Sequence, residues 1–423
     1  MRAPTLTRRR RAALVALLSI AALGCGDSAS APERPEPTSV VLVDSSHSVG
    51  LLAREPMLAS HPNGTWFVGG YGDPGPKLFR SDDRGASWSQ VEVGTEADGA
   101  VANSDVDLAV GPDGTLYYMS MGFDRTTFEG THVVMGVSHD GGATWTWTRL
   151  SEDRFDDRPW VEVTPDGTAH AIWNDGGGVS HAVSRDGGRT WREGPRIHDS
   201  GGSSHLAVGP ANEVAVRIVP LSASGNKIDR GTDLIAVSAD GGVTWAKHPP
   251  PGDRAWGFPL GNPADLPRWV EPIAFDGSGA LYYLWSEGTT MRLARSADRG
   301  ATWTTWTTWT IASGPERCYF PYLIARGDGE LVASWVRGEG DSLRAEVARV
   351  RVGAGEPSVI LGAPIRFDSW APWQKTPDPQ TRDAAGEYLA IAFDGEDGVA
   401  MVSPIQNAQA DRFGFSFWRL AFR

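Results

Sequence analysis

The sequence predicts an all-β protein folded as a single β-propeller, and three observations support this prediction. Glycine, proline and tryptophan number 51, 29 and 18 among 423 residues, which is typical of a chain with many turns and anchored aromatic rings. One eight-residue segment recurs five times. A second unit, an apolar pair followed by a turn and an alternating strand, recurs seven times. Repeats of this kind are typical of propeller blades.

The eight-residue segment has the pattern Ser-x-Asp-x-Gly-x-(Ser/Thr)-Trp. An aspartate accepts hydrogen bonds from the backbone amides that follow it, and glycine adopts the positive φ of a tight turn. Each copy is therefore expected to form a hairpin turn with its tryptophan packed beneath. The copies are Ser81–Trp88, Ser138–Trp145, Ser184–Trp191, Ser238–Trp245 and Ser296–Trp303.

The second unit lies upstream of each of these segments and occurs twice more without one. The seven copies are Met57–Val68, Leu108–Tyr118, Val161–Trp173, Leu206–Val216, Ile273–Leu284, Leu323–Trp335 and Leu389–Val402. Residues 39–423 divided by seven give 55 residues per unit, which suits four short strands with their loops. We expect seven blades, with six as the alternative if one unit is irregular. Ser39–Asp44 is expected to supply the fourth strand of the last blade and so to close the ring.

The first 24 residues are typical of an export signal. Arg2 and Arg8–Arg11 form a basic region, and 13 apolar or small residues follow it, too few to span a bilayer. The segment Ala22–Cys25 resembles the lipobox of bacterial lipoproteins. This resemblance implies cleavage before Cys25, lipidation of its thiol, and tethering in the cell envelope, at the outer membrane or cell surface; ordinary secretion is the alternative. The predicted organisation is a signal peptide (1–24), a lipidated cysteine with a flexible linker (25–38) and a propeller (39–423).

Charge and composition exclude several classes of partner. The net charge of −13 argues against nucleic acid or an anionic membrane face as the main partner, so membrane contact is expected only through the lipid. The nine histidines show no metal-binding spacing, and we expect no metal and no cofactor. Beyond Cys25 only Cys318 remains, which leaves no intramolecular disulfide. A monomer is expected.

The five repeated segments match the Asp-box, or BNR repeat, of the sialidase superfamily. In that family the box lies on the turn between the third and fourth strands of a blade, away from the active face. The resemblance therefore implies structural roles, with calcium binding as a minor alternative, for the aspartates Asp83, Asp140, Asp186, Asp240 and Asp298.

The same resemblance implies a candidate catalytic site. Sialidases bind the substrate carboxylate with three arginines and use an aspartate acid/base and a tyrosine nucleophile assisted by a glutamate. Arg54, in Arg-Glu-Pro, resembles the first arginine of that triad. Asp73 falls where the family keeps its acid/base, and Glu271 is the possible partner of the nucleophile. Tyr319 occupies roughly the place of the nucleophile, and Tyr322 is the other candidate.

The implied site is incomplete. Trp285–Glu287 stands where the family would show a triad arginine, and Arg337 is a possible triad member by position alone. Arg158-Pro159 repeats the Arg54 pattern in another unit, which indicates that an x-Pro start of the first strand is a feature of the repeat. An ordinary role for Arg54 at the start of its blade is therefore the alternative.

Two functions follow from the sequence. The first is a surface-tethered propeller that binds a glycan or a protein through its central face and retains a degenerate catalytic site. The second is an exo-α-sialidase or related glycoside hydrolase that uses Arg54, Asp73, Glu271 and Tyr319. A scaffold role in assembling another complex, as in Asp-box propellers that help to build photosystems, is a third possibility.

Overall fold

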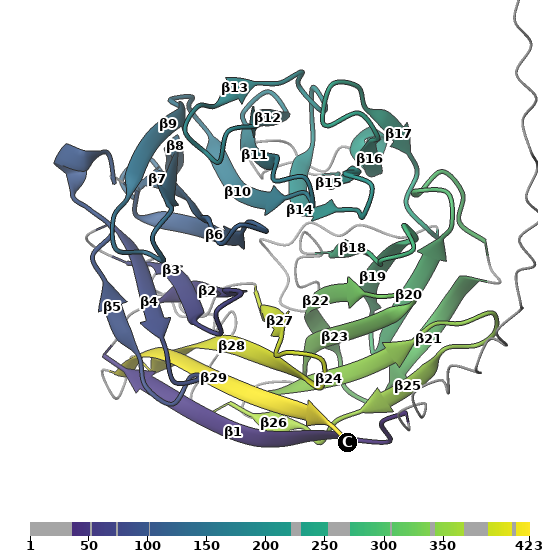
Figure 1. Cartoon of the computed structure of the whole chain (residues 1–423). Helices are drawn as coiled ribbons and strands as arrows, with labels where there is room; N and C mark the ends of the chain where they lie inside the picture. Colours follow the sequence, from purple (N-terminus) through teal and green to yellow (C-terminus); the bar gives the residue numbers. More distant parts are fainter. Residues whose placement is uncertain are drawn as a thin grey trace, which may run out of the picture. The chain divides into compact units, whose positions relative to one another are not determined.

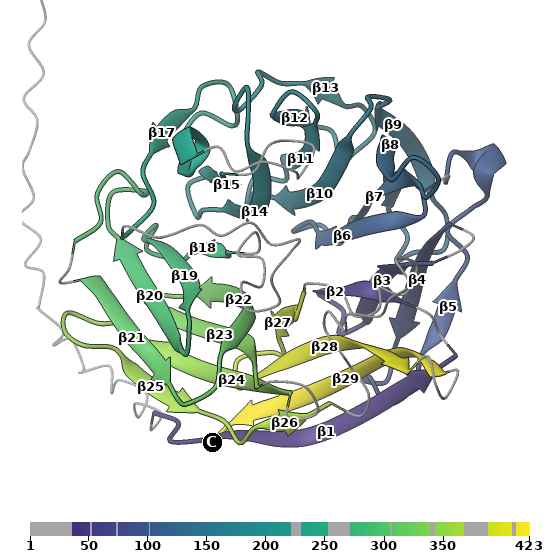
Figure 2. The same cartoon turned by 180° about the vertical axis from the view of Figure 1, so that it is seen from behind.

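The computed structural model describes residues 36–50, 53–72, 75–100, 102–220, 230–252, 271–304, 307–338, 343–367, 388–407 and 412–423. Of the residues singled out by sequence, Cys25 and Asp73 lie outside these ranges. Pro37–Arg423 forms one compact unit. Within it, seven antiparallel sheets are arranged in a ring about a central axis, as Figure 1 and the reverse view in Figure 2 show. The prediction of an all-β, seven-bladed propeller is confirmed, and the six-bladed alternative is wrong.

Each blade begins with its innermost strand. Blade 1 contains β2 (Arg54–Ser60), β3 (Trp66–Tyr71), β4 (Pro76–Ser81) and β5 (Ser89–Val91). Blade 2 contains β6 (Ser104–Val110), β7 (Leu116–Asp124), β8 (Glu129–Ser138) and β9 (Thr146–Ser151). Blade 3 contains β10 (Asp156–Val163), β11 (Ala169–Asp175), β12 (Val179–Ser184) and β13 (Arg192–Glu193). Blade 4 contains β14 (Gly202–Val208), β15 (Val214–Val219), β16 (Leu234–Ser238) and β17 (Ala246–His248).

The remaining blades follow the same plan. Blade 5 contains β18 (Ile273–Phe275), β19 (Leu281–Glu287), β20 (Thr290–Ser296) and β21 (Thr308–Ser313). Blade 6 contains β22 (Cys318–Arg326), β23 (Glu330–Arg337), β24 (Arg344–Arg351), β25 (Ser358–Leu361) and the short β26 (Ile365–Arg366). Blade 7 contains β27 (Ile391–Phe393), β28 (Gly398–Asn407), β29 (Arg412–Phe422) and β1 (Val40–Val49). The helical segments in the described residues are two short 3₁₀ turns, η1 (Glu96–Asp98) and η2 (Arg230–Thr232).

The two ends of the propeller meet in blade 7. β1, from the N-terminal side of the unit, pairs antiparallel with β29, from Val40 opposite Phe422 to Val49 opposite Gly414. The backbone amides of Thr38 and Ser39 also donate to the carbonyl of Arg423 at 2.6 and 2.7 Å. The expected fourth strand is thus present and runs to Val49, beyond the expected end at Asp44. This pairing covers an edge of β29 that would otherwise be open.

The five repeated segments form hairpin turns with one shared geometry. In the first, the Ser81 hydroxyl accepts from the Gly85 amide and donates to Asp83, both at 2.8 Å. The other Asp83 contacts come from the amide and hydroxyl of Ser87. These hydrogen bonds stabilise the ionised carboxylate and lower the pKa of Asp83 to about 2, and the corresponding aspartate of each other segment shows the same shift.

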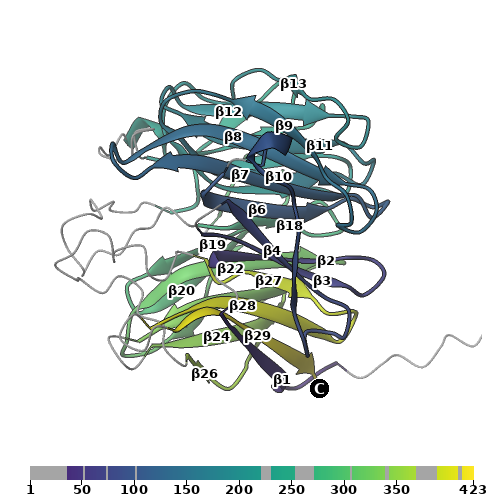
Figure 3. The ribbon, with the colours of Figure 1, turned by 90° about the vertical axis from the view of Figure 1, so that its left-hand side faces the viewer.

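The turns divide the propeller into two faces. The innermost and third strands of a blade run in the same direction, so the turns that follow them lie on one face, here called the turn face. Contacts between blades join these turns, for example from Arg80 to the Gly141 carbonyl at 3.0 Å and from His61 to the Gly114 carbonyl at 3.0 Å. The opposite face, here called the start face, is where the innermost strands begin. Figure 3 shows the propeller from the side.

Candidate functional site

The innermost strands of the seven blades surround a central channel, and alternate side chains point into it. A cavity of about 320 Å³ lies inside, lined by parts of β2, β6, β10, β14, β18, β22 and β27. Most of its lining is aliphatic, with alanine at one level in five blades: Ala59, Ala109, Ala207, Ala274 and Ala392. The ionisable side chains among the described residues of the lining are those of Asp107, Glu162, His205 and Tyr322. These four residues are here called the channel cluster.

Asp107 is buried between the innermost strands of blades 2 and 3. Its carboxylate accepts from the Val161 amide at 2.8 Å and from the Leu108 amide at 2.9 Å. Burial raises the pKa of Asp107 well above its usual value, and the charge of nearby Glu162 raises it further, against the two amide contacts. The folded environment of Asp107 therefore favours the protonated form more than water does.

Glu162 is half-buried and occupies, in blade 3, the level that alanine occupies in its neighbours. Its enclosure raises its pKa to about 7. The charges of Asp107 and Glu162 both raise the pKa of Tyr322, which places the three groups in one electrostatic unit although they come from three blades. The channel thus holds two neighbouring carboxyl groups with raised pKa values, and such a pair can supply an acid and a base.

His205, the fourth member of the channel cluster, packs among aromatic rings. Its ring lies edge-to-face with those of Trp160 and Tyr322, at centroid distances of 5.3 and 5.4 Å, and Trp160 packs in the same way against Tyr388. Burial lowers the pKa of His205 to about 4, so the ring is neutral at pH 7. Its Nδ1 and the Nε1 of Trp160 are buried and have no hydrogen-bond partner in the described structure. Such groups are rare unless a water or ligand satisfies them.

The x-Pro pattern has a structural cause at the start face. Glu55, Arg158 and Phe320 each precede a proline and adopt φ values of +45°, +50° and +49°. The strand register shifts at each of these positions, which identifies a β-bulge near the start of β2, β10 and β22. The bulge recurs in three blades with different neighbouring residues. The Arg-x-Pro sequence at Arg54 therefore marks a backbone feature of the repeat.

Arg54 and Tyr319 occupy equivalent places, each just before the bulge of its blade at the start face. Arg54 lies opposite Tyr71 in blade 1, and its Nε is buried without a hydrogen-bond partner in the described structure. Tyr319 lies opposite Val336 in blade 6 and packs against the hydrophobic cluster shared by blades 6 and 7. Neither residue lines the channel cavity, whereas Tyr322, the other tyrosine candidate, does.

Glu271 belongs to a buried network between blades 4 and 5. Its carboxylate accepts from the hydroxyl of Tyr283 and from Arg217, the latter at 3.2 Å. Arg217 also binds Asp233 and donates to Tyr283 at 2.6 Å, and both Arg217 and Tyr283 are fully buried. The tyrosine beside Glu271 is therefore Tyr283, from its own blade, and the structure does not bring Glu271 together with Arg54.

Two of the residues at the positions considered for the other triad arginines, Arg337 and Trp285, are buried in the protein interior. Arg337 is buried, donates to Glu346 at 2.7 Å and binds the backbone carbonyls of Thr289 and Glu316. Trp285 is buried in the core of blade 5 and Glu287 is exposed at the end of β19. The described residues contain no group of three or more His, Cys, Asp or Glu side chains placed to hold a metal ion.

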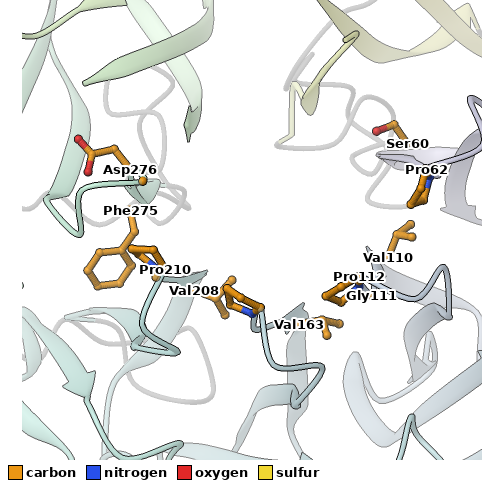
Figure 4. A pocket seen from close by; sticks show the side chains of 13 residues that line it. Ser60, Pro62, Val110, Gly111, Pro112, Val163, Val208, Pro210, Phe275 and Asp276 are labelled. Carbon is orange, nitrogen blue, oxygen red and sulfur yellow. The ribbon is translucent and has the colours of Figure 1, made fainter. Parts of the chain in front are cut away.

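The turn face has its own opening to the channel. A cavity of about 420 Å³ is ringed by the turns of blades 1 to 5 and shares part of its wall with the inner cavity. Figure 4 shows most of its apolar lining: Pro62, Pro112, Pro210, Val110, Val163, Val208 and Phe275. Together with Pro165, these residues are here called the proline collar. Proline fixes φ, so the repeated turns form a stiff apolar rim.

A larger groove of about 760 Å³ lies between blades 1 and 2, away from the channel. Its lining is mixed and includes Lys77, Glu92, Glu96 and His132. Its glutamates Glu92 and Glu96 are exposed, in contrast to the buried Asp107 of the channel cluster. Size alone therefore does not make this groove the better candidate site.

Sequence reasoning missed Asp107, Glu162 and His205, although a signal was present. Asp107 and His205 immediately precede the apolar pair of the repeated unit, and Glu162 interrupts it. In blades whose innermost strands are otherwise aliphatic, a polar residue in this place faces either the blade interior or the channel. Comparing the seven copies position by position would have singled out these three.

No protein-family model matches the chain, and no curated protein is significantly similar to it in sequence. Its fold is similar to that of many solved structures. A fungal alcohol oxidase of the AA5 family, in complex with copper, has a TM-score of 0.54 at 9% identity over 90% of this chain and 76% of that chain. YCF48 from Cyanidioschyzon merolae has a TM-score of 0.50 at 14% identity over 89% and 99%.

A GH74 xyloglucanase from Xanthomonas campestris also has a TM-score of 0.50, at 16% identity over 88% of this chain and 55% of that chain. At such identities the likeness shows the propeller fold and nothing about the chemistry. The described residues contain no helix long and apolar enough to cross a membrane.

Proposed function

We propose that this protein binds a carbohydrate in the central channel, with the channel cluster as its binding site. The observation that carries the proposal is the convergence of Asp107, Glu162, His205 and Tyr322 from four blades on one cavity of about 320 Å³. Sugar hydroxyls need such a mixture of donors and acceptors in a partly apolar pocket. We also propose that Cys25 carries a lipid tether. Mass spectrometry of the mature chain tests this, because the lipid adds to its mass.

Glycoside hydrolysis in the same channel is the second candidate. It is supported by two carboxyl groups that line one cavity, Asp107 and Glu162, both with pKa values raised by burial. Hydrolysis by two carboxyl groups needs one to protonate the leaving oxygen and the other to activate water or attack the sugar. The finer assignment, a sialidase using Arg54, Asp73, Glu271 and Tyr319, has less support because Glu271 is engaged with Tyr283 and Arg217.

A glycan array probed with the purified chain tests the binding proposal. We expect defined hits that Asp107→Asn and Tyr322→Ala each weaken by about tenfold or more, since each removes contacts in the cavity. Glu193→Gln, an exposed change on β13, is the control and should leave binding intact. Hits that persist unchanged in both channel variants would place the binding site elsewhere.

Incubating each hit with the chain and separating the products tests hydrolysis. We expect Glu162→Gln to abolish any sugar release while Glu193→Gln retains it. An α-sialoside assayed beside Arg54→Ala and Asp73→Ala tests the sialidase alternative directly. Binding without release would assign a binding protein, and release that depends on Arg54 and Asp73 would assign a sialidase.

A further inference from the structure

Resting on the proposed function, we infer that the channel selects an uncharged polyhydroxyl ligand over one that carries a carboxylate, and that Glu162 and His205 set this preference. The described residues that line the cavity include two carboxyl groups but no arginine or lysine. Above pH 7, where Glu162 is mostly ionised, a ligand carboxylate inside the cavity would therefore meet a like charge, with no arginine or lysine beside it among the described lining residues. Two like charges at short range in a poorly solvated site repel strongly.

Two described arginines near the starts of innermost strands, Arg54 and Arg158, do not supply the missing positive charge. The Nε of Arg158 lies 3.9 Å from Oδ2 of Asp157, and its Nη1 donates to the Tyr388 hydroxyl at 3.4 Å. The guanidinium group therefore already has an acidic partner and an acceptor. Arg54 is at the first position of β2 and does not line the cavity. A clamp for a carboxylate needs guanidinium groups that face the ligand, as bidentate arginine pairs do.

His205 supplies an independent indication that the cavity binds hydroxyl groups. Its side chain is only 6% exposed, lines the cavity, and has an Nδ1 without a hydrogen-bond partner in the described structure. A neutral imidazole nitrogen is a donor in one tautomer and an acceptor in the other. A hydroxyl group satisfies either tautomer, whereas a carboxylate satisfies only the donor.

The test uses matched pairs of oligosaccharides that differ by a single charge. Each pair has the same ring at its end, glucose with glucuronate or galactose with galacturonate, and sialic-acid and glucosamine ends complete the set. Binding is measured in solution by calorimetry at about pH 8.5, where Glu162, whose pKa is about 7, is mostly ionised. We expect the neutral member of a pair to bind at least about tenfold more tightly than its uronate, which is the effect of modest charge repulsion.

Two substitutions of Glu162 show whether the preference for neutral ligands depends on the charge of this residue or on the shape of the site. Glu162→Gln removes the charge and should narrow the neutral-to-uronate ratio by about tenfold or more, whereas Glu162→Asp keeps the charge and should retain the ratio. Glu193→Gln should leave the ratio unchanged. Thermal unfolding of each variant confirms that it is folded.

The outcomes distinguish this inference from the proposed function. Absence of binding to every oligosaccharide would overturn both. Equal binding of neutral and uronate members, tighter binding of the uronate, sialic-acid or glucosamine ends, or a ratio that Glu162→Gln does not move would overturn the inference alone. In each of these cases the channel would remain the proposed binding site.

Discussion

His170 and His181 lie edge to edge inside blade 3, on β11 and β12. Their rings are parallel within 2°, and Nδ1 of His170 lies 3.1 Å from Nε2 of His181. Both side chains are fully buried, and burial lowers their pKa values to about 4 and about 3. One ring donates the hydrogen bond and the other accepts it. Because burial disfavours the charged form, the folded pair stays uncharged at pH values where an exposed histidine takes up a proton.

This pair predicts a loss of stability in acid. The unfolded histidines take up protons below about pH 6.5, whereas the folded ones do so only near pH 4 and below, so stability falls as the pH drops through this window. At about 1.4 kcal/mol per pKa unit the loss reaches several kcal/mol. Urea unfolding at pH 7 and pH 4.5 measures it. His181→Met should reduce the difference, and the exposed His139→Met should not.

The repeated hairpin turn is stabilised by its own residues but is also packed against a neighbouring blade. Gly85 and Gly142 occupy the same place in two copies, with φ values of +88° and +92°. A Cβ on Gly85 would lie 2.1 Å from the ring of Phe417 in blade 7, whereas one on Gly142 would meet nothing nearer than 3.5 Å. The same glycine position therefore has room for an added Cβ atom in blade 2 but not in blade 1.

Alanine at these two glycines separates backbone strain from packing. Both variants share the cost of a positive φ, about 1–2 kcal/mol. Gly85→Ala must also displace Phe417, and we expect it to be less stable than Gly142→Ala by a further 1–3 kcal/mol or so. Equal midpoints in chemical unfolding would mean that Phe417 moves aside at no cost.

The whole molecule depends on ring closure through β1 and β29. Nine residue pairs join these strands, and Phe415 and Phe417 of β29 contribute to the core that blade 7 shares with blade 1. Without β1 the edge of β29 would be open and its buried neighbours partly exposed.

Removing β1 should therefore open the ring. A chain beginning at residue 50 is expected to unfold at a lower temperature than a chain beginning at residue 36, and to associate through the exposed edge of β29. Thermal unfolding and size-exclusion chromatography of the two chains test this. A monomer with an unchanged midpoint would show that the six other blades hold the ring without closure.

Much of the architecture could be predicted because its signals are local. The Ser-x-Asp-x-Gly-x-(Ser/Thr)-Trp turn depends on hydrogen bonds among residues at most four positions apart, as those of Asp83 with Ser81 and Ser87 show. The apolar alternation of each strand is equally local. Seven repeats and a spare N-terminal strand then suffice to predict a closed ring.

The site was harder to predict because its members are distant in sequence. Tyr322 was a sequence candidate, but it was paired there with Glu271, which the structure places in an interior network with Arg217. The Arg-x-Pro pattern at Arg54 proved to be part of a β-bulge shared by three blades. A short motif does not distinguish a backbone requirement from a chemical one.

By itself, the sequence determined that this chain is a seven-bladed propeller closed by its N-terminal strand, since turn chemistry and strand alternation act over a few residues. The tertiary structure decided which polar residues meet. Asp107, Glu162 and His205 lie in three separate repeats and share one cavity only because the innermost strands of successive blades are brought side by side. The perturbed pKa values arise there from burial and, for Asp107, also from the charge of Glu162 in the next blade, which no local pattern encodes.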